Sequence, residues 1–138
     1  YENRVMHSRD FHDDGKDAGE LGSGHTVTAL YEIVPRIDGS TADYLKVELR
    51  YKAPEGGASK LVSAEIGGDD ASARPSADFR FAAGVAAFGM MLRDSPHKGT
   101  ADWAMVERLV QVGIGSDETG RRKELLDLVK RSAALKAR

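Results

Sequence analysis

An acidic loop near the start of the chain carries the residue types best suited to binding a metal ion. Oxygen-rich loops with a glycine at a sharp turn are what Ca²⁺ selects. Against the pattern D-x-[DN]-x-[DN]-G-x5-E, Asp10, Asp14 and Gly15 fit. His12 stands at the third position and Leu21 at the twelfth, where the bidentate acid belongs. A solvated loop whose carboxylates cap their own backbone is the alternative that we favour. The candidate metal ligands are Asp10, Asp13, Asp14, Asp17 and Glu20.

Two further residues are candidates for binding, and none is a candidate for catalysis. The four histidines are scattered and form no short zinc spacing. Cysteine is absent and no Gly-x-Ser-x-Gly elbow occurs, so no nucleophile is predicted. His25, at the start of an expected strand, could make a buried hydrogen bond. Trp103 could line a binding surface, although its helical spacing favours a place in the core. No cofactor is predicted, with Ca²⁺ as the alternative. The alternative function is a domain that binds Ca²⁺ or a small ligand through the acidic loop Asp10 to Glu20.

Length and composition indicate one domain, residues 1–138, and do not favour nucleic acid or an anionic membrane as a partner. The chain has 138 residues, of which 41% are hydrophobic, enough for one ordinary core. The formal net charge is −2 and the charges are mixed along the chain, which argues against nucleic acid and anionic membrane as partners. The longest apolar run, Phe81 to Leu92, is shorter than the roughly 20 residues that span a bilayer. Because the chain begins at Tyr1 rather than at a methionine, we expect it to be cut from a longer precursor.

The first half of the chain has the pattern of an antiparallel sheet. Residues 1–24 are interpreted as a short edge strand followed by the acidic loop. Alternating apolar and polar residues then predict a β-meander over residues 25–66. Its strands are expected at 25–33, 45–51 and 61–66, and Leu45, Val47 and Leu49 give the second of them one apolar face. The sequence therefore predicts three to four strands with one face that needs a cover.

The second half, residues 76–136, has the pattern of three helices. Ser76 is placed to cap the first helix, which contains the apolar run. A second helix is expected from Thr100 to the break at Gly113, and a third after Ser116 or Asp117. Strands followed by helices favour an α+β fold, in which the three C-terminal helices cover the sheet.

The first expected helix carries two stripes of side chains, one bulky and one small. Bulky side chains recur at helical spacing and are expected to bury against the strand face. Small residues form a second stripe that allows another backbone to approach closely. The bulky stripe consists of Phe81, Val85, Phe88 and Leu92, and the small stripe of Ala82, Ala86 and Gly89.

Several short motifs are spread over nearly the whole chain. The first half contains Tyr1-Glu2-Asn3-Arg4, Asp10-Phe11, Asp13-Asp14, Asp17-Ala18-Gly19-Glu20 and Gly24-His25-Thr26-Val27-Thr28-Ala29-Leu30-Tyr31-Glu32. The second half adds Leu49-Arg50-Tyr51-Lys52, Asp78-Phe79-Arg80-Phe81-Ala82-Ala83, Val85-Ala86-Ala87-Phe88-Gly89-Met90, Leu92-Arg93-Asp94-Ser95 and Lys98-Gly99. Together these motifs resemble the C-terminal region of bacterial von Willebrand factor type A proteins of the YfbK type.

The resemblance carries expectations about the parent protein rather than about chemistry in this chain. It implies an adhesion-type von Willebrand A domain upstream of Tyr1, in parents that are often lipoproteins or exported proteins of the bacterial envelope. It supplies no catalytic residue to carry over. We therefore expect a non-catalytic accessory or protein-interaction module, located in the envelope or periplasm or secreted. Its expected partners are the upstream A domain and further proteins, without insertion of this domain into the membrane.

Overall fold

A computed structural model describes residues 6–16, 19–34, 45–67 and 74–136. The chain divides into two compact units, each of which is described by itself. The hairpin unit contains the described residues up to 67 except 28–30, and the helical unit contains residues 74–136 together with 28–30. The prediction of a single domain, and that of helices packed on the sheet, therefore stay predictions.

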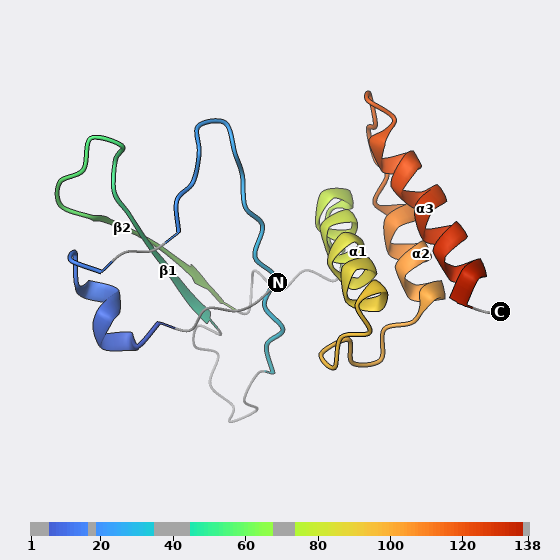
Figure 1. Ribbon diagram of the computed structural model, residues 1–138, viewed down its shortest axis with the longest axis horizontal. Coiled ribbons are helices and arrows are strands. Elements are labelled where there is room, and N and C mark those ends of the chain that lie inside the picture. The colour runs from blue at the N-terminus through green and yellow to red at the C-terminus, as the bar shows by residue number, and fades with distance from the viewer. Residues whose placement is uncertain (1–5, 17–18, 35–44, 68–73, 137–138) are drawn as a thin grey trace. The chain divides into compact units, whose positions relative to one another are not determined.

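The hairpin unit is built on two antiparallel strands, β1 (Leu45–Tyr51) and β2 (Lys60–Ile66) (Figure 1). Both were expected from the alternation of side chains, so the α+β class with an antiparallel sheet is confirmed. A short 3-10 helix, η1 (Ser8–His12), lies in the segment interpreted as a loop. Gly56 and Gly57, in the connection between the strands, have φ of 78° and 98°, a left-handed conformation that glycine adopts without steric cost.

The predicted strand over residues 25–33 is wrong. Residues 25–34 form no strand, and Val27, Tyr31 and Val34 are exposed. Alternating β-branched and aromatic residues suit the half-buried surface of a β-sheet. They form a strand only where a partner strand is available for pairing. The sheet formed by the described residues therefore has two strands rather than three or four. The edge strand expected at the N-terminus falls mostly on residues 1–5, which lie outside the described residues.

The helical unit consists of α1 (Ala77–Leu92), α2 (Trp103–Val112) and α3 (Arg121–Lys136) (Figure 1). Ser76 caps α1 as predicted, because its Oγ accepts a hydrogen bond from the Phe79 N–H at 3.1 Å. The cap of α2 is Asp102 rather than Thr100, with its carboxylate 2.6 Å from the Met105 nitrogen. The third helix begins at Arg121, later than expected. None of the described helices is long and apolar enough to cross a membrane.

The core of the helical unit lies where α2 packs against both α1 and α3. Its buried members come from all three helices, and Phe81, Phe88, Met90 and Met91 of α1 pack against them partly buried. Val106 and Val110 of α2 and Val129 of α3 are fully buried in this core, whereas Leu128 and Leu135 of α3 are exposed. The buried residues are Ala87, Val106, Val110, Leu126 and Val129.

The side of α1 that packs against α2 coincides with neither predicted stripe. Phe81 and Phe88 contact the core, but Val85 and Leu92 are exposed. The close approach is made by Gly84, whose hypothetical Cβ would lie 2.7 Å from a methyl group of Val110. A hypothetical Cβ at Gly89, in the predicted small stripe, would meet no atom of another element within 4 Å. Both stripes therefore lie partly or wholly on the outer side of α1.

Candidate functional site

The acidic loop uses its carboxylates within the hairpin unit. Asp13 accepts a hydrogen bond from the Gly15 N–H at 2.8 Å, as a self-capping loop requires. The Asp10 carboxylate lies 3.7 Å from the Arg9 guanidinium and 4.0 Å from the Lys16 ammonium. Glu20 is exposed, and Asp17 lies outside the described residues. Among the described residues no three histidine or acidic side chains are grouped to hold a metal ion. The Ca²⁺ site stays a prediction.

Asp14 is the loop carboxylate with the most contacts. It accepts hydrogen bonds from the Ser59 hydroxyl and backbone N–H, the latter at 3.2 Å, and pairs with Arg50 at 3.0 Å. The Ser59 hydrogen bonds, followed by the charges of Arg50 and Lys52, hold the pKa of the Asp14 carboxyl below its ordinary value. Arg50 also approaches Nδ1 of His12 at 3.1 Å, where the imidazole must accept because a guanidinium only donates. We call Asp14, Arg50, Ser59 and His12 the loop latch.

The loop latch joins a serine, a histidine and an aspartate, but not in the order that activates a nucleophile. Catalysis by such residues needs the imidazole between the hydroxyl and the carboxylate. Here Ser59 donates directly to Asp14, and His12 contacts Arg50 instead. These residues connect η1 and the acidic loop to the hairpin. Arg50 and Asp14 are 36 positions apart in the sequence, and Ser59 and Asp14 are 45 positions apart. This arrangement fixes the loop on the strands.

The two candidate binding residues lie in different surroundings. His25 is exposed, and its backbone N–H donates to the Gly22 carbonyl at 3.1 Å in a turn. Trp103, the first residue of α2, is partly buried, with its ring edge-to-face on Phe88 at a centroid distance of 6.1 Å. That contact is typical of packing between helices. A binding role for either residue stays a prediction.

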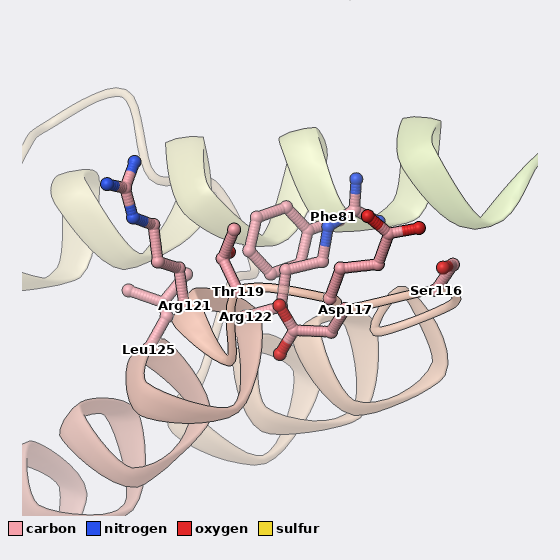
Figure 2. Close-up of a pocket in the computed structure, with 8 residues that line it drawn as sticks. Phe81, Ser116, Asp117, Thr119, Arg121, Arg122 and Leu125 are labelled. Carbon is pink, nitrogen blue, oxygen red and sulfur yellow. The ribbon is translucent and has the colours of Figure 1, made fainter.

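The helical unit contains an open pocket of about 590 Å³ between the turn that precedes α3 and the start of α1 (Figure 2). Its lining is mixed, with charged and hydroxyl side chains around two apolar ones. The lining residues are Phe81, Ser116, Asp117, Glu118, Thr119, Arg121, Arg122 and Leu125.

Arg122 joins all three helices at the floor of this pocket. From α3, its Nη1 donates to the carbonyls of Gly113 at 2.9 Å and Ile114 at 3.4 Å, beyond the end of α2. Its Nη2 lies 2.6 Å from the Asp78 carboxylate of α1, and its guanidinium carbon is 4.7 Å from the centre of the Phe81 ring (Figure 2). A cation near the last carbonyls of a helix is electrostatically favourable. Arg122 is therefore occupied by intramolecular contacts rather than presented to a ligand.

Asp117 is occupied in a similar way. Its Oδ2 accepts a hydrogen bond from the Lys123 N–H at 3.0 Å, in the first turn of α3. Desolvation opposes its ionisation, but the backbone N–H groups of Lys123 and Arg122 and their positive charges together hold the pKa of Asp117 below its ordinary value. The chemistry around the pocket thus stabilises helix ends.

Sequence reasoning did not find Arg50, Ser59 or Arg122. The loop latch depends on contacts between residues far apart in the sequence, and no local spacing signals them. For Arg122 one signal was available, because an arginine after a Gly-rich helix break can donate to the carbonyls left free at that break.

Comparisons with known proteins place the chain in a family. The family model described as "Uncharacterized protein YfbK, C-terminal" matches residues 1–42 and 36–135. Over 147 aligned residues the chain is 30% identical to the "Uncharacterized protein YfbK" of Escherichia coli (strain K12), and the alignment covers 94% of this chain. It covers 25% of that protein, so the chain spans about a quarter of the length of this relative. The search of solved structures found no match. The chain belongs to the family of YfbK C-terminal domains.

Proposed function

We propose that this chain is a non-catalytic accessory module that makes protein–protein contacts as the C-terminal part of a longer envelope protein. The observation that carries the proposal is an apolar face of the hairpin that the hairpin unit leaves open. Cross-strand partners in an antiparallel pair lie on the same face, so the register defines this face. It consists of Leu45, Val47, Leu49, Tyr51, Val62, Ala64 and Ile66, together with the stem of Lys60.

The η1 segment lies on the opposite, more polar face and covers only part of it. Glu48 and Arg50 lie on that face, and the η1 segment packs there through the loop latch. A shallow open pocket is lined by residues of this segment and by Glu48, namely Met6, His7, Ser8, Phe11, His12 and Glu48. On the apolar face Leu49, Tyr51 and Val62 are exposed, and Leu49 retains 58% of its accessible surface.

A hairpin with an exposed apolar face is not expected to be stable by itself. A two-stranded hairpin is marginally stable in water and needs further strands or a packed apolar face. Contiguous exposed apolar surface of this kind marks an interaction site in soluble proteins. The aliphatic and aromatic side chains on the pleat suit a partner of the same character, such as the surface of another folded protein.

The proposed partner is the polypeptide that precedes the domain in the full-length protein. Three supports favour it: the family is defined by a C-terminal region, the chain spans a quarter of its relative, and a covalent link raises the effective concentration of a neighbouring domain. The resemblance adds a von Willebrand A domain as that neighbour and the bacterial envelope as the location. Membrane insertion and nucleic-acid binding form no part of the proposal.

A matched pair of variants tests the proposal. Leu49→Glu charges the apolar face, whereas Leu61→Glu charges the opposite face, where Leu61 is 52% exposed and pairs with Arg50. Burying a leucine contributes about 1.5–3 kcal/mol, so Leu49→Glu should weaken binding to the separately expressed preceding polypeptide at least about tenfold. Isothermal titration calorimetry measures both dissociation constants.

Leu61→Glu should stay within about twofold of the unchanged chain in the same titration. Absence of binding at a few hundred micromolar, or equal weakening by both variants, would contradict the proposed use of this face. Circular dichroism of both variants establishes that the comparison is made between folded proteins.

A further inference from the structure

The outer side of α1 is a second apolar surface, separate from the hairpin face. Phe79, Val85 and Leu92 are 53%, 42% and 49% exposed, although α2 covers the other side of the same helix. A helix that is apolar around its whole circumference is normally buried on all sides. Ala82, Ala86 and Gly89 lie between the exposed bulky side chains, with nothing within 4 Å of the Gly89 position.

The distribution of side chains on this surface is self-complementary. Asp78 lies in the first turn of α1 and Arg93 is the C-terminal cap, so an acid and a base stand at opposite ends of the helix. Both side chains are exposed, and the backbone N–H of Arg93 is already used by the cap. Asp78 Oδ1 accepts a hydrogen bond from Arg122 of the same chain, and the Asp78 side chain is 80% exposed.

An antiparallel pair of α1 helices brings these complementary residues together. With a two-fold axis midway between Val85 and Ala86, Asp78 of one copy lies at the same level as Arg93 of the other. The same axis puts Phe79 level with Leu92 of the second copy, and Ala82 level with Gly89. Ala82 and Gly89 also lie on the same side of the helix, so a small residue falls beside a small one and this contact occurs twice. Phe79 and Leu92 lie on opposite edges of that side and flank the contact. A parallel pair would instead place the two acids together and the two bases together.

We propose that the outer side of α1 is a homodimer interface, occupied by α1 of a second copy of this chain in antiparallel orientation. The small residues let the two helices approach closely, while Phe79, Val85 and Leu92 exclude water at the edges. The ends are tied by ion pairs between Asp78 and Arg93. This inference uses a different surface from the proposed contact with the preceding polypeptide and stands or falls independently of it.

A second matched pair of variants tests the interface. Val85→Glu puts two charges near the two-fold axis, whereas Val112→Glu changes an equally exposed valine, 50%, at the end of α2. Sedimentation equilibrium of the chain from 1 to 500 µM should show a monomer–dimer equilibrium. Val85→Glu should raise its dissociation constant at least tenfold, and Val112→Glu should leave it within twofold. A monomer at all concentrations, or equal effects of the two variants, would overturn the proposal.

Disulfide trapping gives a readout that does not depend on the folding of a charged variant. The chain has no cysteine, so a single Ala86→Cys variant reports one contact only. Because Ala86 lies near the proposed two-fold axis, the Ala86→Cys variant should form an intermolecular disulfide under mild oxidation at least tenfold faster than the Val112→Cys variant. Equal rates for the two variants would contradict an interface formed by the outer side of α1, even where a dimer exists.

Discussion

Replacing Gly113 with alanine should lower the free energy of unfolding of the helical unit by about 2–3 kcal/mol. A Cβ at this position would lie 2.5 Å from the Phe81 nitrogen and 2.7 Å from its Cα. Backbone atoms of a helix cannot move aside as a flexible side chain can, so α1 and the end of α2 would have to separate. Gly113 has φ −83°, which alanine adopts readily, so the expected loss is steric rather than conformational.

Gly89→Ala is the matched control and should have the opposite sign. Nothing lies within 4 Å of its hypothetical Cβ, and alanine is favoured over glycine inside a helix by about 1 kcal/mol. Urea unfolding followed by circular dichroism at 222 nm and by Trp103 fluorescence measures both, at a protein concentration low enough to keep the chain monomeric. A Gly113→Ala variant as stable as the unchanged chain would contradict the close approach.

Replacing Arg122 with alanine should cost about 2–3 kcal/mol. Hydrogen bonds from a charged group contribute about 1.5–3 kcal/mol, and the stacking on Phe81 about 0.5–1 kcal/mol. The ion pair with Asp78 adds little, because that carboxylate is largely exposed. The Arg122 side chain itself is only 27% exposed, so its two carbonyl contacts are shielded from water.

Arg122→Lys distinguishes geometry from charge. A single ammonium cannot reach the Gly113 and Ile114 carbonyls and the Asp78 carboxylate together, as the planar guanidinium does. We expect lysine to recover less than half of the loss, measured by the same urea unfolding. Full recovery would show that only the positive charge matters at this position.

The parts of the fold that could be predicted from the sequence are those specified by local chemistry. Ser76 marked the start of α1 because its hydroxyl can satisfy a free N–H, and Gly113 marked the end of α2. The two observed strands follow from alternation. Segment 25–34 has the same alternation without forming a strand, because pairing depends on a partner that local pattern does not encode.

The orientation of α1 could not be predicted for a different reason. Its last twelve residues, Phe81 to Leu92, carry no polar side chain, so no solvent face indicates which side points inward. The bulky residues suggested a direction, but the face that packs is the one that carries Gly84, where the absence of a side chain lets α2 approach closely. Val85 and Leu92 therefore remained exposed while Ala87 became buried.

At the candidate sites, too, contacts set by local sequence could be predicted and contacts set by tertiary structure could not. The self-capping of Asp13 could be predicted from its place in an acidic, Gly-rich loop. The pairing of Asp14 with Arg50 and Ser59 could not, because it depends on the hairpin register and on the path of η1. In the loop latch and around the pocket before α3, the charged groups hold segments of the chain together. Because these groups are engaged within the chain, the proposed function is based on the exposed apolar surface.

Hydrogen exchange of the β1 and β2 backbone amides tests the central claim most directly. The rates are compared between the isolated chain and the full-length protein that contains it, under identical conditions and with α2 amides as an internal reference. If the preceding polypeptide covers the apolar face of the hairpin, the Leu45–Tyr51 and Lys60–Ile66 amides should exchange at least tenfold more slowly in the full-length protein. Equal rates in the two proteins would contradict the account.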